Sequence, residues 1–234
     1  MTAIRAEGLA KSYGDAEALV DLSLSVERGE CLGLLGANGA GKTTTIGVLV
    51  GRVAPDAGRA EVLGVDPTRD PVGVRERVGV LPERASPPSF LTPREYFEFV
   101  ATVRGVDDAT REARVAEWAD RLSFGTALDT LCADLSRGQQ QKAMVTATFL
   151  HEPAVVLVDE PLVNLDPVMQ ERVKEFLDDY RAAGNAVVLS THHIETAAAV
   201  CTRVAVVGEG RVRGEHRPAD LGDGGLLDAF LAEA

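Results

Sequence analysis

The chain has 234 residues, of which 45% are hydrophobic and 26% are charged, and this length is enough for one large domain with a sizeable core. Its formal net charge is −12, and the absence of any basic run argues against a nucleic-acid partner held through phosphate neutralisation. The N-terminus lacks the pattern of a signal peptide, and the apolar runs are far shorter than the roughly 20 residues of a membrane helix, so we expect no membrane span in this chain.

The first third of the chain predicts mostly strands. Apolar and polar residues alternate over 4–10 and 18–26, which indicates two half-buried antiparallel strands. The apolar run 31–35 predicts a short buried strand, and 43–50 predicts a helix that begins directly after a glycine-rich loop. Two more short strands, separated by a polar segment, are expected at 59–65 and 78–81.

The character of the sequence changes from Thr92 onward. Thr92 and Pro93 form a helix start signal, the segment 111–122 has helical periodicity, and a further helix is expected to open at 134–137. Residues 90–150 are therefore predicted to form a mostly helical lobe.

The last third alternates strands and helices. The continuous apolar runs 154–158 and 186–190 predict strands of a parallel sheet that is covered on both faces. A helix over 170–183, a hairpin of 204–207 with 211–214, and a short amphipathic helix at 226–231 complete the prediction. The pattern indicates an α/β fold.

The glycine-rich loop at 36–44 fits a glycine, four free positions, then glycine, lysine and a hydroxyl residue. Such a loop points its backbone N–H groups at an anion, and the positive end of the following helix adds to the same point. Lys42 is expected to reach the β- and γ-phosphates of a nucleotide, and Thr43 to coordinate Mg²⁺. The alternative is an ordinary glycine-rich turn. The residues assigned to phosphate binding are Gly36, Asn38, Gly39, Ala40, Gly41, Lys42, Thr43 and Thr44.

Two adjacent acids, Asp159 and Glu160, end a predicted hydrophobic strand. The carboxyl ends of parallel strands face the ligand crevice, so Asp159 is expected to bind Mg²⁺ and Glu160 to orient or deprotonate the attacking water. The alternative is a helix cap beside a solvated loop acid. His192 follows the next strand, where an imidazole can hydrogen-bond the γ-phosphate; the alternative is a structural histidine, which is the more common role of such a residue taken alone. His193 is interpreted as a flanking residue.

Five motifs occur in the order and spacing of ATP-binding cassette (ABC) ATPases, and together they make the chain resemble that family over about residues 4–214. They are the loop at 36–44 and the segments 135–139, 157–161, 164–167 and 190–192. The resemblance implies a phosphate-loop NTPase core with a parallel sheet, an N-terminal antiparallel β subdomain and an inserted helical subdomain. The implied division is a single cassette domain over 1–234, with its core in 1–89 and 151–214, the helical subdomain at 90–150 and a C-terminal helix at 224–234.

The resemblance further implies a head-to-tail dimer that sandwiches two ATP molecules. Ser136 and Gly138 of one subunit are then expected to face the phosphate loop of the other, with Gln139 completing this signature. A plain N-capped helix explains Ser136 alone, but we do not expect it to explain Gly138 and Gln139. The same resemblance places Asp166 at the dimer interface, with helix capping as the alternative, and Tyr13 against the adenine ring.

Three residues depart from the family pattern. Glu83 stands where the family usually has a glutamine that binds Mg²⁺, and we expect the carboxylate to keep that role. Arg137 replaces a glycine of the signature and Ala37 replaces a common proline of the phosphate loop, and both are expected to be tolerated.

The predicted function is that of an ATP-binding and ATP-hydrolysing subunit of an export-type transporter, with Lys42, Glu160 and His192 as its catalytic set and ATP and Mg²⁺ as its ligands. Its expected partners are a second ATP-binding subunit, identical or related, and a separate transmembrane permease, which would hold it on the cytoplasmic face of the membrane. The alternative is an ABC-type ATPase that is not coupled to transport, such as an iron–sulfur cluster assembly ATPase. A kinase or GTPase with the same loop is disfavoured by the signature at 135–139.

Overall fold

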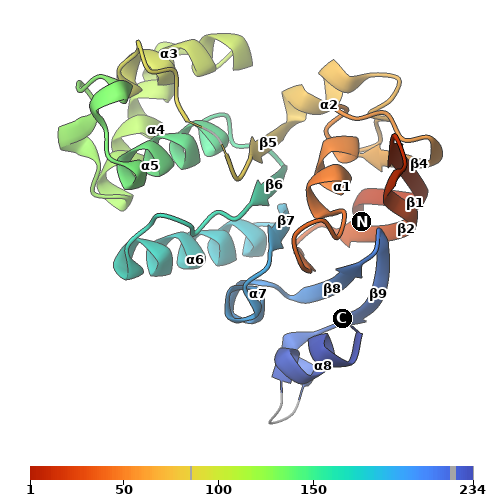
Figure 1. The fold of residues 1–234 in the computed structure, drawn as a ribbon. Helices are drawn as coiled ribbons and strands as arrows, with labels where there is room; N and C mark the ends of the chain where they lie inside the picture. Colours follow the sequence, from red (N-terminus) through yellow and green to blue (C-terminus); the bar gives the residue numbers. More distant parts are fainter. Residues whose placement is uncertain (85, 222–224, 234) are drawn as a thin grey trace.

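The computed structural model describes residues 1–84, 86–221 and 225–233, which form two β-sheets and a set of helices around them (Figure 1). The predicted α/β fold is confirmed. The smaller sheet is antiparallel, with the strand order β2-β1-β4. Its strands are β1 (Thr2–Tyr13), β2 (Ala16–Glu27) and β4 (Ala57–Val62). The alternation that predicted the first two strands places one set of side chains in the core between the sheets.

The larger sheet has the strand order β5-β6-β7-β3-β8-β9, and all its neighbouring strands are parallel except β8 and β9. Its strands are β3 (Cys31–Leu35), β5 (Val78–Leu81), β6 (Val155–Asp159), β7 (Ala186–Thr191), β8 (Arg203–Gly208) and β9 (Arg211–His216). Every residue of β3, β6 and β7 is buried, as expected for strands that are covered on both faces. The carboxyl ends of these three central strands therefore meet at one edge.

Helices occupy the positions that the sequence predicted, with two additions. The helices are α1 (Lys42–Leu49), α2 (Pro71–Arg77), α3 (Pro93–Arg104), α4 (Asp108–Arg121), α5 (Arg137–Phe149), α6 (Pro167–Ala182), α7 (Ile194–Val200) and α8 (Gly225–Glu233). Short 3₁₀ turns lie at Gly125–Ala127, Cys132–Asp134 and Pro218–Asp220. Helices α3, α4 and α5 gather on one side of the sheets, away from α1 and α2 (Figure 1).

Several boundaries differ from the sequence prediction. Helices α2 and α7 were not predicted, and α6 begins at Pro167 rather than at residue 170 because Asp166 caps it. The strand predicted at 59–65 ends at Val62, since Leu63 and Gly64 turn the backbone with φ values of 51° and 80°. The predicted C-terminal helix is present as α8, while residues 224 and 234 of that prediction lie outside the described residues.

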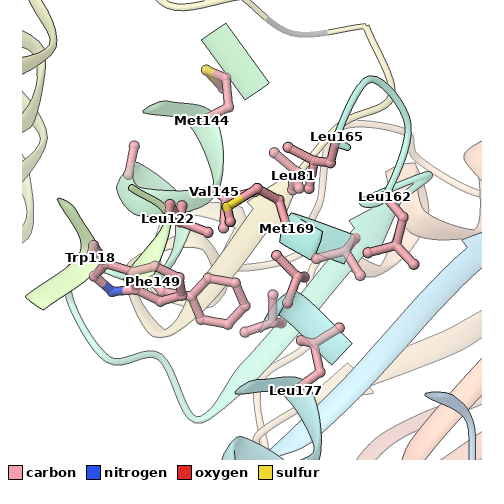
Figure 2. Close-up of a cluster of buried hydrophobic side chains, with 14 of the residues drawn as sticks. Leu81, Trp118, Leu122, Met144, Val145, Phe149, Leu162, Leu165, Met169 and Leu177 are labelled. Atoms are coloured by element: carbon pink, nitrogen blue, oxygen red, sulfur yellow. The ribbon is translucent and has the colours of Figure 1, made fainter. Parts of the chain in front are cut away.

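A hydrophobic cluster joins the helical region to the larger sheet (Figure 2). The Trp118 ring of α4 stacks on Phe149 of α5 with ring centroids 5.4 Å apart, and it meets Phe176 of α6 edge-on at 4.5 Å. Such aromatic pairs add about 0.5–1.5 kcal/mol each beyond the area they bury. This packing fixes α5 and α6, the two helices whose N-termini carry the signature and the acidic loop.

In the part of the chain that the structure covers, no helix is both long enough and apolar enough to cross a lipid bilayer.

Candidate functional site

A cavity of about 240 Å³ opens at the carboxyl ends of β3, β6 and β7, where the sequence predicted the nucleotide site. It brings together eleven of the predicted site residues from five separate segments of the chain. Its lining consists of Tyr13, Ala18, Asn38, Gly39, Gly41, Lys42, Thr43, Thr44, Glu83, Asp159, Glu160 and His192. Ala18 was not predicted, because an alanine on an alternating strand carries no signal of a site.

The loop between β3 and α1 owes its shape to its glycines. Gly39 and Gly41 have φ values of 85° and 108°, a region that L-residues with side chains rarely adopt. At Gly36 a Cβ atom would lie 2.2 Å from the Val207 carbonyl oxygen, so only glycine fits between the loop and β8. Gly36 and Ala40 do not line the cavity: Ala40 is buried, and its carbonyl accepts a hydrogen bond from the Gly210 N–H. These two residues therefore pack the loop against β8 and the β8–β9 turn, on the side away from the cavity.

The Lys42 ammonium group lies over the same loop. Its Nζ donates hydrogen bonds to the carbonyl oxygens of Gly36 at 2.6 Å and Ala37 at 3.0 Å. Burial lowers the pKa of Lys42, while the nearby charges of Asp159, Glu160 and Glu83 act in the opposite direction. The ammonium therefore has two hydrogen-bond partners and keeps a third donor for an anion in the cavity.

Thr43 and Asp159 are linked by a side-chain hydrogen bond at the cavity. The Thr43 hydroxyl donates to Asp159 Oδ2 at 3.0 Å, and Asp159 is only 5% exposed at the end of β6. Glu83 adds a third oxygen-bearing side chain to the lining. All three residues that the sequence assigned to Mg²⁺ thus border one space.

Glu160 is held from three sides at the end of β6. Its Oε1 accepts hydrogen bonds from the His192 backbone N–H at 2.9 Å and from His192 Nδ1 at 2.6 Å, and its Oε2 accepts from the Thr191 hydroxyl at 2.9 Å. Its backbone φ of 51° lies in the left-handed region that costs a non-glycine residue energy. A carboxylate offers about four lone-pair positions, so roughly one remains for a further donor such as a water molecule.

Two features of this arrangement were not foreseen from the sequence. Thr191 was part of a recognised motif, but its hydroxyl orients the Glu160 carboxylate, and a buried threonine at a strand end gives no separate signal of that role. His192 was expected to face a phosphate, yet its Nδ1 contacts Glu160, which leaves Nε2 as the ring nitrogen available to a ligand.

The four remaining predicted residues lie outside the cavity. Ser136 is the N-cap of α5, where it accepts from the Gln139 N–H at 3.3 Å while the Gln139 side chain accepts from the Ser136 N–H at 2.9 Å. This reciprocal capping box accounts for Gln139 within one chain, contrary to our expectation that a capped helix would not. A Cβ atom on Gly138 would lie 3.0 Å from the Asn164 carbonyl oxygen, so Gly138 also fits closely here.

Asp166 lies outside the cavity as well. It caps α6 by accepting a hydrogen bond from the Met169 N–H at 3.1 Å. The capping alternative that the sequence left open is therefore realised in the single chain.

Comparisons with known proteins show the family to which the chain is similar. A family model described as ABC transporter matches residues 19–163. Daunorubicin resistance ATP-binding protein DrrA3 of Streptomyces coeruleorubidus is 35% identical, with 100% of this chain and 75% of the relative covered. Nod factor export ATP-binding protein I of Rhizobium etli is 33% identical over 95% of this chain and 71% of its own length.

Solved structures extend the likeness to the whole fold. An ATP-binding subunit of an ABC transporter superposes with a TM-score of 0.92 and 29% identity, covering 99% of this chain and 98% of that one. A dimeric ATP-binding cassette bound to ADP and Pi shares the fold at a TM-score of 0.84 and 21% identity, with 92% and 98% covered. The chain therefore belongs to the ABC transporter family, as one of its ATP-binding, ATP-hydrolysing subunits.

Proposed function

We propose that this chain binds ATP with Mg²⁺ in the cavity at the ends of β3, β6 and β7, and that hydrolysis there powers export through a separate membrane subunit. The observation that carries the proposal is the meeting of Lys42, Asp159 and Glu160 in one cavity, although they lie far apart in the sequence. Their proximity supports a site in which an ammonium group binds phosphates, oxygen atoms bind a metal ion and a carboxylate accepts a proton from water.

The residues present fit Mg²⁺. This ion prefers hard oxygen ligands at 2.0–2.1 Å in octahedral geometry, whose neighbouring ligands lie roughly 2.9 Å apart. The Thr43 hydroxyl and Asp159 Oδ2 are 3.0 Å apart, so the pair matches two adjacent positions of such a shell. When bound, the ion neutralises phosphate charge during transfer. We propose that Thr43 and Asp159 hold it and that Glu83, whose side chain borders the same space, supplies a further oxygen.

The phosphate loop is proposed to hold the triphosphate. Lys42 already lies over the loop, and residues 38, 39 and 41–44 border the space that the phosphates would occupy. Tyr13 at the end of β1 is half exposed and borders the same cavity, which supports its proposed contact with the adenine ring.

Glu160 is proposed to accept the proton of the attacking water. The hydrogen bonds from Thr191 and His192 fix the carboxylate, and one lone-pair position remains for the water. His192 donates through Nδ1 to Glu160, so its Nε2 contacts a phosphate oxygen as a donor only when that nitrogen also carries a proton.

Ser136, Gly138, Gln139 and Asp166 are proposed to act in trans, on the nucleotide of a second ATP-binding subunit. The Ser136 oxygen accepts a bond within its own chain, which leaves its O–H free to donate to a phosphate. Gly138 has no side chain to obstruct the approach, and the first turn of α5 supplies the positive end of a helix dipole. Gln139 supports this surface by holding the Ser136 backbone.

The membrane partner is proposed to dock on a groove beside β5. This cavity of about 240 Å³ is bordered by Val80 of the sheet and by Phe99 and Val103 of α3, which are 59% and 65% exposed. Exposed apolar side chains of this size mark an interaction surface. The curated relatives are named for drug resistance and for Nod factor export, which supports export over an iron–sulfur assembly role. Docking on a permease would place the chain on the inner face of the membrane.

We also propose that residues 1–234 act as one cassette domain. In this division the core comprises 1–89 and 151–214, and the helical subdomain at 90–150 contains α3, α4 and α5. The terminal helix α8 packs on β8 and β9 of the core.

The composite site is tested by mixing two inactive variants, Lys42→Ala and Gly138→Asp. If each site combines the loop of one copy with Ser136 and Gly138 of another, a mixed pair holds one intact site and ATPase activity returns. The matched control mixes Lys42→Ala with the double variant Lys42→Ala/Gly138→Asp, which leaves no intact site. Activity of the first mixture equal to that of the separate variants would contradict pairing between identical copies.

A further inference from the structure

Two adjacent histidines lie beside Glu160 where β7 passes into α7. The rings of His192 and His193 have centroids 4.0 Å apart and an interplanar angle of 38°. One ligand atom each from Glu160, His192 and His193 lies within 4.8 Å of the others. The site described above uses the first two of these residues and assigns nothing to the third.

The His193 side chain is not needed to hold the local structure. Its backbone N–H donates to the Thr191 hydroxyl at 3.1 Å, but its ring does not cap α7 and has no hydrogen bond among the residues that the structure describes. The residue is exposed and borders a polar cavity of about 260 Å³ together with Glu160 and Glu195. Its imidazole is therefore accessible to an ion from solvent.

The donor set is that of a transition metal rather than of Mg²⁺. Two imidazoles and one carboxylate are typical ligands of Zn²⁺, whereas Mg²⁺ favours oxygen ligands. Around a tetrahedral zinc ion with ligands at 2.0–2.1 Å, ligand atoms lie roughly 3.3 Å apart. The His192 Nδ1 to Glu160 Oε1 distance is 2.6 Å, so this pair opens by less than about 1 Å to admit the ion.

The surroundings allow that movement and favour a cation. The His192 side chain is 46% exposed, so its ring has room to turn outward. The neighbouring acids Asp159 and Glu195 add negative charge on both sides of the cluster. A divalent ion with one carboxylate and two neutral imidazoles keeps only one positive charge, which these acids stabilise.

We propose that Glu160, His192 and His193 form a binding site for a divalent transition-metal ion of the zinc type in the nucleotide-free chain, and that its occupation inhibits ATP hydrolysis. Binding follows from the cluster alone. Inhibition rests on the proposed roles of Glu160 and His192, because the ion takes the Glu160 lone pair that the water needs and holds the His192 ring away from its position beside Glu160.

Metal binding is measured on the full chain without an affinity tag and without nucleotide. Isothermal titration calorimetry with Zn²⁺ should show one binding site in the wild type. Its affinity should fall at least about tenfold in His193→Ala, because the loss of a metal ligand weakens binding at least as much as the loss of an outer-shell partner. His216→Gln is the matched control, because its histidine pairs with Glu233 at the C-terminal helix and should leave the affinity unchanged. His193→Asn provides a second variant that retains a residue suited to helix capping.

Binding of Co²⁺ gives an independent signature. The wild type should develop the visible absorption of a tetrahedral site, and His193→Ala should not. Equal Zn²⁺ affinity in the wild type and both His193 variants, or no binding by the wild type, would overturn the proposal.

The activity arm compares ATP hydrolysis of the wild type and His193→Ala in identical mixtures of MgATP and Zn²⁺. Without zinc the two rates of ATP hydrolysis should agree. The zinc concentration that halves the rate should be at least about tenfold lower for the wild type than for the variant. Zinc that binds through His193 without inhibiting would contradict the proposed role of Glu160 while leaving the metal site intact. Inhibition equal in both chains would contradict the metal site as its cause.

Discussion

His151 makes the stability of the fold sensitive to mild acid. Its Nε2 lies 3.2 Å from the Val78 carbonyl oxygen, and its Nδ1 is buried with no hydrogen-bond partner in the described part of the chain. Burial, followed by the charge of Arg104 and a smaller contribution from Arg114, lowers the pKa of His151 from 6.5 to about 4, against the opposing effect of Val78. A second ring proton would therefore lack an acceptor and lie near two cations.

The sign of the effect follows from proton uptake. Between pH 6.5 and about 4 the unfolded chain binds a proton at His151 and the folded chain does not, so stability is lost as the pH falls through this window. The pKa difference between the unfolded and the folded chain corresponds to a loss of unfolding free energy of at most about 3 kcal/mol, of which about 2 kcal/mol is lost at pH 5. Because the ring is partly exposed, solvent screening reduces the expected loss at pH 5 to about 1–2 kcal/mol.

The assay is urea unfolding of the wild type and His151→Gln at pH 7.5 and at pH 5. Glutamine keeps a donor for Val78 but does not titrate, and all other titrating groups are shared by the two proteins. The wild type should lose about 1–2 kcal/mol more than the variant between these pH values. An equal loss in both proteins would refute the reasoning that His151 remains neutral in the folded state.

Substitutions at three further positions, Gly36, Gly39 and Glu83, test the site directly. Gly36→Ala places a Cβ atom 2.2 Å from the Val207 carbonyl oxygen, so two backbone segments must separate. The free energy of unfolding in urea should fall by about 1–3 kcal/mol, and ATP binding should weaken. Gly39→Ala, where nothing lies within 4 Å, should cost only about 1 kcal/mol from its φ of 85°, and equal costs at both positions would contradict the steric argument. Glu83→Ala should raise the Mg²⁺ concentration needed for half-maximal ATPase activity. Glu83→Gln should raise it less, because the amide keeps one oxygen ligand. Unchanged Mg²⁺ dependence in the alanine variant would contradict the metal role of Glu83.

The sequence predicted best those elements whose signals are continuous or repeated. The buried strands at 31–35, 154–158 and 186–190 had uninterrupted apolar runs, and their parallel pairing brought the phosphate loop, Asp159 and His192 to one edge as expected. The start of α3 was also predicted, because its signal, Thr92 followed by Pro93 at the first helical position, is local in the sequence.

The two missed helices have seven residues each. Helix α7 begins after His193, which forms no side-chain cap, so its start signal is absent. Helix α2 does have Asp70 as its cap and Pro71 in its first turn, but Gly73 inside it weakens the pattern. Helices this short are stabilised by tertiary packing rather than by propensity, which no local pattern reveals.

The contacts within the site were the least predictable part. The pairing of Glu160 with His192 and Thr191 joins residues about thirty positions apart, and it depends on the register of β6 against β7. Likewise, Gln139 was interpreted from the family resemblance, whereas its capping role needed only the spacing of Ser136 and Gln139. The capping-box rule applied to that spacing would have found it.

The most direct test of the catalytic role of Glu160 measures ATP binding and single-turnover hydrolysis in the variant Glu160→Gln. The amide preserves the size of the side chain and its acceptor toward Thr191 or His192, but it cannot take a proton from water. ATP affinity should stay close to that of the wild type, and the hydrolysis rate constant should fall by about 10²–10⁴-fold. Hydrolysis at the wild-type rate with ATP bound would contradict the proposal that Glu160 is the base.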